Sequence, residues 1–256
     1  MSHALKSRLS AAGIHLLISL ALAAAAAWLV FGLWYPYPYR EISGGRELFF
    51  LVMAVDVIMG PLLTLAVFNR NKPFRELRRD LAVIGLLQLA ALAYGLWTVA
   101  VARPVHLVFE YDRFRVVHAI EVDDAELLQA TPGLQQLPWM GPTTLSLRAF
   151  QNDKEKIDLT LAAIGGIPLS ARPTLWQSYQ QAQPQILRAA RPLADLKARL
   201  PQQAGAIDAA LKASAAGNTP AQFVGYLPMA GRDKFWTVLF NLNSTEVIAF
   251  VPIDSF

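Results

Sequence analysis

The sequence has no cysteine and few charges among its 256 residues. Without cysteine, disulfide bonds, thiolate metal sites and cysteine nucleophiles are excluded. Charged residues make up 16% of the chain, below the roughly 25% typical of soluble proteins, whereas hydrophobic residues make up 54%. This balance indicates that part of the chain lies in a lipid bilayer.

The positive charge is confined to the first part of the chain. The net charge is +4, and residues 103–256 contain 14 basic and 14 acidic side chains, so the whole surplus lies in residues 1–102. Binding to nucleic acid requires a basic face that neutralises phosphates. We therefore expect no nucleic-acid partner and interpret the surplus as a signal of membrane topology.

Three apolar runs are long enough to cross a bilayer, which takes about 20 helical residues. They cover residues 11–33, 48–68 and 81–102, and the first and third contain no Asp, Glu, Lys or Arg. In short loops, Lys and Arg accumulate on the cytoplasmic side of the membrane. Here they precede the first run and separate the second from the third, at Lys6, Arg8, Arg70, Lys72, Arg75, Arg78 and Arg79.

These charges predict a membrane anchor over residues 1–102, with three passes, a cytoplasmic amino terminus and a domain on the outer side of the membrane formed by residues 103–256. Membrane lipid is then one partner. The alternative for residues 1–33 is a cleaved signal peptide, but the apolar run is longer than the usual core of such a signal. A retained helix is the better interpretation.

One carboxylate, Asp56, interrupts the second apolar run. Near mid-membrane it costs about 2.5 to 3.5 kcal/mol on insertion scales and usually faces a partner. Gly60 and Pro61 follow, and a proline lacks the N–H of an ordinary helical residue, so we expect a kink or gap beside Asp56. Two interpretations remain open: a notch that binds a client helix, or a carboxyl group that is protonated or hydrogen-bonded within the bundle, for instance to Gln88 or Thr98.

Residues 103–256 are predicted to form an α+β domain with strands at both ends and helices between them. The strands are expected at residues 105–109, 113–118, 143–150, 221–227, 234–242 and 246–253, mostly joined by short turns. Asn152 or Asp153 caps an expected helix whose apolar face holds Ile157, Leu161 and Ile164. The prolines of residues 172–216 predict several short helices. The predicted fold class is a three-helix transmembrane anchor followed by a mixed α+β domain with antiparallel strands on the outer side of the membrane.

The C-terminal domain contains no motif of a known catalytic class. It has no G-x-S-x-G, no Walker-type glycine loop and no H-E-x-x-H, and its only histidines are His106 and His118. We expect no catalytic residue, no metal site and no cofactor. The competing class is a membrane-bound transferase, with its charged groups drawn from Arg40, Glu41, Arg46, Glu47 and Arg103.

Short motifs between residues 13 and 142 combine aromatic residues, glycine and proline in a distinctive way. They include Trp34-Tyr35-Pro36, Gly44-Gly45-Arg46-Glu47-Leu48, Val55-Asp56-Val57, Gly60-Pro61-Leu62-Leu63-Thr64, Ala102-Arg103-Pro104-Val105 and Leu137-Pro138-Trp139. These motifs are similar to those of the TfpX/TfpZ-type accessory proteins of type IV pilins.

The resemblance implies a polytopic inner-membrane protein of bacteria that promotes assembly of a pilin into fibres, with no catalytic residues. It implies a type IV major pilin as partner, and other pilus assembly proteins as further possible partners. We hypothesise a chaperone-like protein with two sites of pilin contact. The first is an intramembrane contact at Asp56, Gly60 and Pro61, and the second is an outer-surface loop contact at Arg40, Gly44, Gly45 and Arg46.

Overall fold

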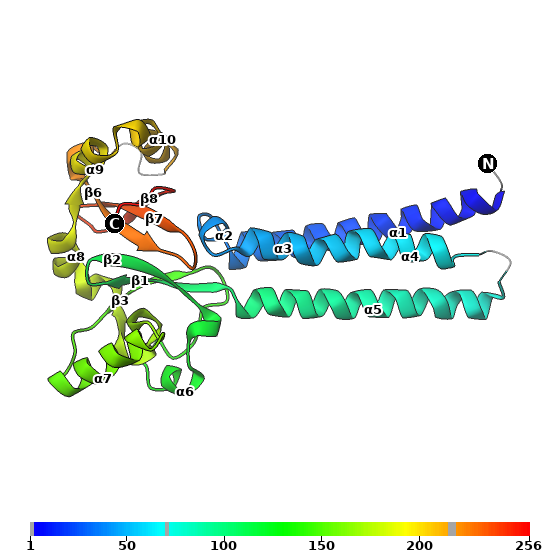
Figure 1. The fold of residues 1–256 in the computed structure, drawn as a ribbon, viewed down its shortest axis with the longest axis horizontal. Coiled ribbons are helices and arrows are strands. Elements are labelled where there is room, and N and C mark those ends of the chain that lie inside the picture. The colour runs from blue at the N-terminus through cyan, green and yellow to red at the C-terminus, as the bar shows by residue number, and fades with distance from the viewer. Residues whose placement is uncertain (1–2, 70–71, 215–218) are drawn as a thin grey trace. The chain divides into compact units, whose positions relative to one another are not determined.

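The computed structural model describes residues 3–69, 72–214 and 219–256, and the chain divides into two compact units. The helical unit comprises Met1–Arg40 and Gly44–Ala102, and the C-terminal unit comprises Glu41–Ser43 and Arg103–Phe256. Figure 1 shows helices in the first unit and a sheet flanked by helices in the second. The predicted α+β fold class, with apolar helices ahead of a mixed domain, is confirmed.

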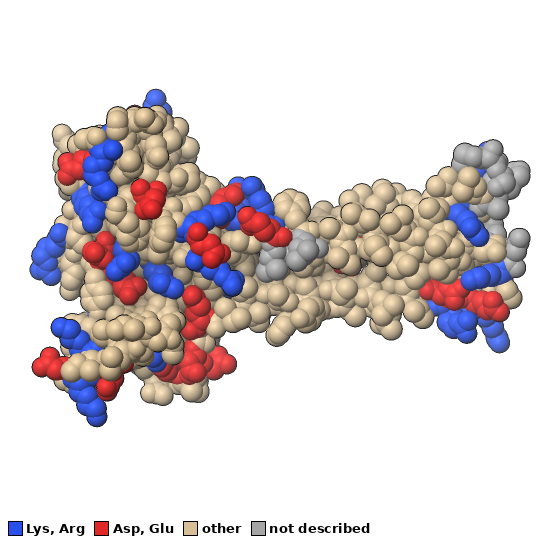
Figure 2. All heavy atoms as spheres, in the orientation of Figure 1, with Lys and Arg blue, Asp and Glu red and all other residues tan. Residues whose placement is uncertain are grey.

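Three helices among the described residues are long and apolar enough to cross a membrane: Leu5–Trp34, Gly45–Val67 and Phe74–Val101. The protein is therefore membrane-associated. Each helix begins a few residues before the predicted apolar run, because backbone hydrogen bonds continue through polar residues that a hydropathy pattern excludes. In Figure 2 the visible face of the helical unit is nearly free of charged side chains between its two ends.

The three spans are built from shorter elements of differing helical type. The first joins α1 (His3–Ala27) to a π-helical end (Trp28–Trp34), and the short α2 (Tyr39–Ile42) follows it. The second joins α3 (Gly45–Ala54), a π-helical turn (Val55–Met59) and α4 (Gly60–Val67), and the third is α5 (Phe74–Val101). The expected irregularity beside Asp56 is therefore present as the π-helical turn.

Small residues allow the helices of this unit to pack closely, as expected for membrane helices. A Cβ atom added to Gly95 of α5 would lie 2.3 Å from Cγ1 of Val52, so only glycine permits this approach to α3. Near the same end of the unit, the hydroxyl of Tyr35 donates a hydrogen bond to the carbonyl of Val99 at 3.1 Å. Tyr35, Phe49 and Val99 belong to one buried cluster.

The C-terminal unit contains one eight-stranded sheet among its described residues, in the order β4-β3-β1-β2-β6-β7-β8 with β5 paired to β6. The strands are β1 (Pro104–Glu110), β2 (Arg113–His118), β3 (Thr143–Leu147), β4 (Trp176–Ser178), β5 (Arg191–Pro192), β6 (Val224–Ala230), β7 (Phe235–Asn241) and β8 (Val247–Val251). The hairpin of β1 and β2 and the meander of β6, β7 and β8 are antiparallel, as predicted.

Two pairings differ from the predicted antiparallel arrangement, because β1 pairs with β3 and β2 pairs with β6 in parallel. The end of β2 lies beside the start of β1, where Pro104 pairs with His118. Strand β3 also begins beside the start of β1, on the edge of β1 opposite to β2. It therefore runs parallel to β1. The sequence interpretation also missed β4 and β5, whose three and two residues are too short to show alternation.

In Figure 1, α9 and α10 lie at one end of the C-terminal unit, α6 and α7 lie at the other, and α8 lies between them. Leu196 of α9 and Ile207 of α10 pack with β6, β7 and β8 in one buried cluster, and Leu127 of α6 joins a second cluster with β1, β2 and β3. The α-helices are α6 (Asp124–Leu127), α7 (Asp153–Ile164), α8 (Gln183–Ala189), α9 (Leu193–Arg199) and α10 (Ala204–Ala213). Short 3₁₀ turns cover Ala119–Glu121, Leu169–Ala171, Pro173–Leu175, Tyr179–Ala182, Pro201–Gln203 and Ala221–Phe223.

Helix α7 forms where it was predicted, but the three apolar residues expected on one of its faces are not buried. The side chain of Asn152 caps it by accepting a hydrogen bond from the backbone N–H of Glu155 at 2.8 Å, as expected. Its apolar residues remain on the surface, since Ile157 is 59%, Leu161 62% and Ile164 79% exposed. The apolar pattern therefore predicted the helix but did not identify a part of the core.

Candidate functional site in the helical unit

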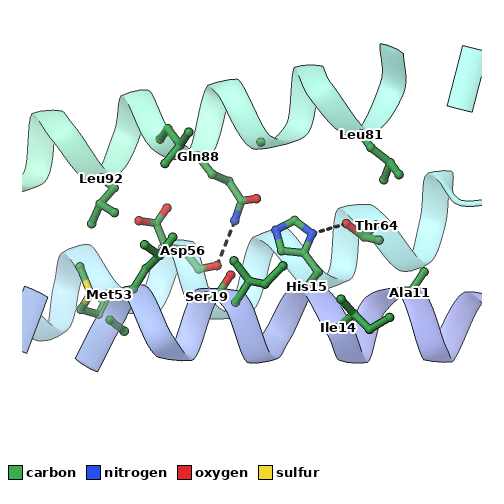
Figure 3. Close-up of a pocket in the computed structure, with 15 residues that line it drawn as sticks. Ala11, Ile14, His15, Ser19, Met53, Asp56, Thr64, Leu81, Gln88 and Leu92 are labelled. Atoms are coloured by element: carbon green, nitrogen blue, oxygen red, sulfur yellow. Dashed lines mark hydrogen bonds between the residues drawn. The ribbon is translucent and has the colours of Figure 1, made fainter. Parts of the chain in front are cut away.

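A cavity of about 460 Å³ lies within the helical unit, among α1, α4 and α5. This volume falls in the range of roughly 300 to 1,000 Å³ that is usual for ligand pockets. Aliphatic side chains form most of its wall, and Figure 3 shows the polar residues that interrupt them. These are His15 and Ser19 of α1, Asp56 of the π-helical turn, Thr64 of α4 and Gln88 of α5.

Asp56 occupies the middle of the second span, eleven residues from each end of Gly45–Val67. At 1.5 Å per residue it lies about 16 Å from either end, which is mid-membrane depth. The residue is 9% exposed, and among the described residues neither of its carboxylate oxygens has a hydrogen-bond partner. Figure 3 shows the side chain directed into the space between its own helix and α5. A buried carboxylate without a donor is expensive, so this group requires an explanation.

Pro61 explains the backbone around Asp56. An ordinary residue at position 61 would donate its N–H to the carbonyl of Val57 in an α-helix, or to that of Asp56 in a π-helix. Proline has no N–H to donate. The side-chain amide of Gln88 instead donates to the carbonyl of Asp56 at 3.1 Å. Gln88 thus satisfies the backbone of Asp56 and leaves its carboxylate without a donor.

The two side chains that the sequence offered as partners of the Asp56 carboxylate, Gln88 and Thr98, therefore donate to other groups. The amide nitrogen of Gln88 is bonded to the backbone of Asp56, and the hydroxyl of Thr98 donates to the carbonyl of Tyr94 in its own helix at 2.9 Å. The amide oxygen of Gln88 has no partner among the described residues and is buried. The cavity wall therefore contains three buried acceptor atoms without a donor, two from Asp56 and one from Gln88.

Gly60 and Pro61 shape the surroundings of Asp56 but do not line the cavity. A Cβ atom added to Gly60 would lie 1.9 Å from the amide nitrogen of Gln88, so the glycine makes room for the amide that bonds to Asp56. The structure thus brings Asp56 and Gly60 to the same side chain of α5. Pro61 acts through the N–H that it lacks.

His15 and Thr64 form a second polar contact of the cavity. Nδ1 of His15 and Oγ1 of Thr64 share a hydrogen bond at 2.5 Å, which joins α1 to α4 (Figure 3). The sequence interpretation did not include Thr64 or Ser19 in the site. A signal was present, because Asp56, Gly60 and Thr64 recur every fourth residue and therefore share one helix face.

The glycines of the predicted outer-surface loop have backbone roles. Gly44 adopts a φ of +69° immediately before α3, a conformation that favours glycine. A Cβ atom added to Gly45 would lie 2.4 Å from Cδ1 of Tyr35, so this position also requires glycine. The guanidinium of Arg40 lies 5.7 Å from the centre of the Tyr37 ring, and Arg46 is exposed. These four residues are separate from the cavity lining.

The described part of the chain contains no group of three or more His, Asp or Glu side chains placed to hold a metal ion. The cavity is instead an apolar chamber with a few polar groups on its wall. Such a wall is suited to recognising a ligand by shape and by a small number of hydrogen bonds.

Comparisons with known proteins place this arrangement in a family. The chain is 38% identical over 247 residues to the fimbrial assembly protein of serogroup I from Dichelobacter nodosus, a match that covers 95% of this chain and 94% of that protein. The chain belongs to the fimbrial assembly protein family. The serogroup E1 protein of the same organism is 37% identical over 246 residues.

Two further comparisons concern parts of this chain. Residues 3–44 match the family model described as "Fimbrial assembly protein FimB". The protein of serogroups C1 and C2 from Dichelobacter nodosus is 44% identical over 118 residues, which cover 46% of this chain and 90% of that protein. No solved structure matches the chain. Its family and its three apolar helices together assign it a membrane-associated role in pilus assembly.

Proposed function

We propose that this fimbrial assembly protein is a non-catalytic, chaperone-like accessory protein of the bacterial inner membrane that binds a type IV pilin and promotes its incorporation into pili. The observation that carries the proposal is the mid-membrane cavity with the buried, unpartnered carboxylate of Asp56. A polar group of this kind in a membrane helix usually faces a partner. The names of the relatives and the resemblance to TfpX/TfpZ-type proteins support a pilin as that partner.

The proposed topology gives such a client two places of contact. Basic residues lie at the start of the first span and of the third, so the amino terminus is assigned to the cytoplasm and, after three passes, the C-terminal unit to the periplasm. The membrane helix of the client then contacts the helical unit from the side. Its head contacts the outer-surface loop of Arg40, Gly44, Gly45 and Arg46 and the C-terminal unit.

Co-isolation tests the proposal. The full-length protein is purified in detergent from cells that express it with a type IV major pilin of the same organism, and the mass of the recovered pilin is measured. We expect a stable complex that contains pilin of unmodified mass. Failure to recover the pilin would contradict the proposal, and a pilin mass shift that depends on this chain would support the competing transferase instead.

Two variants connect the complex to the cavity. Asp56→Ala should lower both the recovered pilin and surface piliation, while the protein itself accumulates normally. Thr98→Ala is the control, because the Thr98 hydroxyl bonds within its own helix and does not line the cavity. Equal piliation in the two variants would remove Asp56 from the proposed site.

A further inference from the structure

We infer that the cavity recognises a hydrogen-bond donor at mid-membrane depth, and that its preferred ligand is a positively charged amine carried by the transmembrane helix of a partner. The inference rests on the proposed function for the identity of the client, but it concerns the chemical group that is bound. The described residues leave buried acceptors without donors on the cavity wall.

The missing hydrogen-bond partners of the polar groups in the cavity indicate which chemical group the ligand carries. Both carboxylate oxygens of Asp56 and the amide oxygen of Gln88 are buried acceptors without a partner. The amide nitrogen of Gln88 donates one of its two N–H groups to the backbone of Asp56, and Nδ1 of His15 shares a hydrogen bond with Thr64, so neither bond reaches these acceptors. A ligand that completes these bonds must supply N–H or O–H groups. An ammonium group supplies three N–H donors and no acceptor.

The negative charge of the Asp56 carboxylate favours an amine over a neutral hydrogen-bond donor. Hydrogen bonds between an ammonium and a carboxylate are roughly twice as strong as those between neutral groups. In a membrane the pairing also offsets the cost of burying the carboxylate of Asp56, which has no hydrogen-bond partner among the described residues. A partner with a carboxylate at the same depth would instead be repelled.

The depth of Asp56 in its span favours an amine carried by a helix over one carried by a lipid headgroup. Asp56 lies eleven residues, or about 16 Å, from each end of its span, whereas lipid headgroups lie outside the hydrocarbon core. A transmembrane helix can bring a side chain to this depth and can place aliphatic side chains against the rest of the cavity wall. Gly85 lines the cavity, and a Cβ atom added there would meet nothing within 4 Å. There is therefore room in the wall at this position.

Synthetic helices provide a defined test. The full-length protein is reconstituted in phosphatidylcholine vesicles, whose headgroups carry no N–H donor, and is titrated with dye-labelled 23-residue Leu/Ala peptides that carry Lys, Ser, Leu or Glu at their centre. Binding is measured by energy transfer. We expect the Lys peptide to bind at least ten-fold more tightly than the Leu peptide, the Ser peptide to lie between them, and the Glu peptide to bind no better than the Leu peptide. Equal binding of the Lys and Leu peptides would overturn the inference.

Variants of the cavity decide whether the preference arises there. Asp56→Asn, which removes the charge and keeps the size, should reduce the preference for Lys over Leu to less than two-fold, and Asp56→Glu should retain most of it. Gly85→Leu should fill the cavity and weaken binding of the Lys peptide. Gly13→Leu is its matched control, because Gly13 also has open space around it but does not line the cavity. An unchanged preference in Asp56→Asn, or equal losses in the two glycine variants, would contradict the inference.

Two further measurements separate other outcomes. Addition of phosphatidylethanolamine should change binding of the Lys peptide by less than two-fold, whereas strong competition would identify a lipid amine as the ligand and overturn the assignment to a helix. Co-isolation of the pilin tests the proposed function separately. Pilin binding without a preference for the Lys peptide would reject this inference alone, and the preference without pilin binding would reject the proposed function alone.

Discussion

At the scale of the residue, Pro61 determines how the polar groups around Asp56 are used. Because it cannot donate a backbone hydrogen bond, the Gln88 amide bonds to the carbonyl of Asp56, and Gly60 leaves the space that this amide needs. The carboxylate is then left without a donor. Because Pro61 lacks this one N–H, the Gln88 amide bonds to the backbone of Asp56 and not to its carboxylate. Among the described residues, the acceptor atoms of both side chains therefore have no donor.

A buried histidine in the C-terminal unit shows a different use of a polar group. His106 is 3% exposed, its ring packs edge-on against Trp176 at 4.5 Å, and its Nδ1 shares a hydrogen bond with Oγ1 of Thr143 at 2.8 Å. Burial disfavours the charged imidazolium and lowers the pKa of His106 to about 4. The folded protein therefore keeps this ring neutral at a pH where an exposed histidine is charged.

The first prediction is that the free energy of unfolding falls as the pH is lowered from about 6.5 to 4. In this window the unfolded chain binds a proton at His106 that the folded chain does not, so stability decreases with decreasing pH. Between pH 6.5 and 5 the loss from this residue is about 2 kcal/mol. Chemical unfolding of the detergent-solubilised protein at both pH values measures it. His106→Gln should lose this part of the pH dependence, and identical pH profiles for the two proteins would contradict the prediction.

At the scale of the element, two helices place a leucine in opposite environments. Leu196 of α9 is fully buried in the cluster formed with β6, β7 and β8, whereas Leu161 of α7 is 62% exposed. The same residue type in an α-helix is therefore a core residue in one case and a surface residue in the other. The pattern identifies an apolar helix face but not what covers it.

The second prediction compares the same substitution in these two helices. Leu196→Ala should lower the free energy of unfolding by about 2 to 5 kcal/mol, because it leaves a cavity in a packed cluster. Leu161→Ala should change it by less than about 0.5 kcal/mol, because leucine and alanine have similar helix propensities and no buried contact is lost. Chemical unfolding of the full-length protein measures both. Equal losses would mean that the α7 face is covered in the folded protein.

At the scale of the whole molecule, the number of spans and the position of the basic residues determine the topology. Three described helices can cross a membrane, and an odd number places the two termini on opposite sides. Lys6 and Arg8 lie on the first of these helices, and Arg75, Arg78 and Arg79 lie on the third. Arg70 of the predicted basic loop lies outside the described residues. The proposed orientation follows from these charges and not from the fold.

The third prediction uses the absence of cysteine to test this orientation. Asn243→Cys introduces a thiol in the exposed turn between β7 and β8, and Glu76→Cys introduces one in the exposed first turn of α5. A membrane-impermeant maleimide should label Asn243→Cys in cells with a permeabilised outer membrane, and Glu76→Cys only after lysis. The reverse pattern would place the C-terminal unit in the cytoplasm.

The sequence by itself determined the features that depend on local chemistry. Apolar runs with at most one charged residue predicted three membrane helices, because a backbone in lipid must bond within its own segment. Alternating apolar residues around short turns predicted the β1–β2 hairpin and the β6–β8 meander, and Asn152 predicted the start of α7. Each of these signals lies within a few residues along the chain.

Only the tertiary structure decided which distant residues meet. It paired β1 with β3 and β2 with β6 in parallel, left the apolar face of α7 exposed, and directed the Gln88 amide to the backbone of Asp56 instead of its carboxylate. It also brought α1, α4 and α5 together around a cavity that no single helix contains. Hydropathy measures the tendency of a residue to leave water, but it does not specify the neighbour that the residue finds, because that choice depends on packing between segments far apart in the chain.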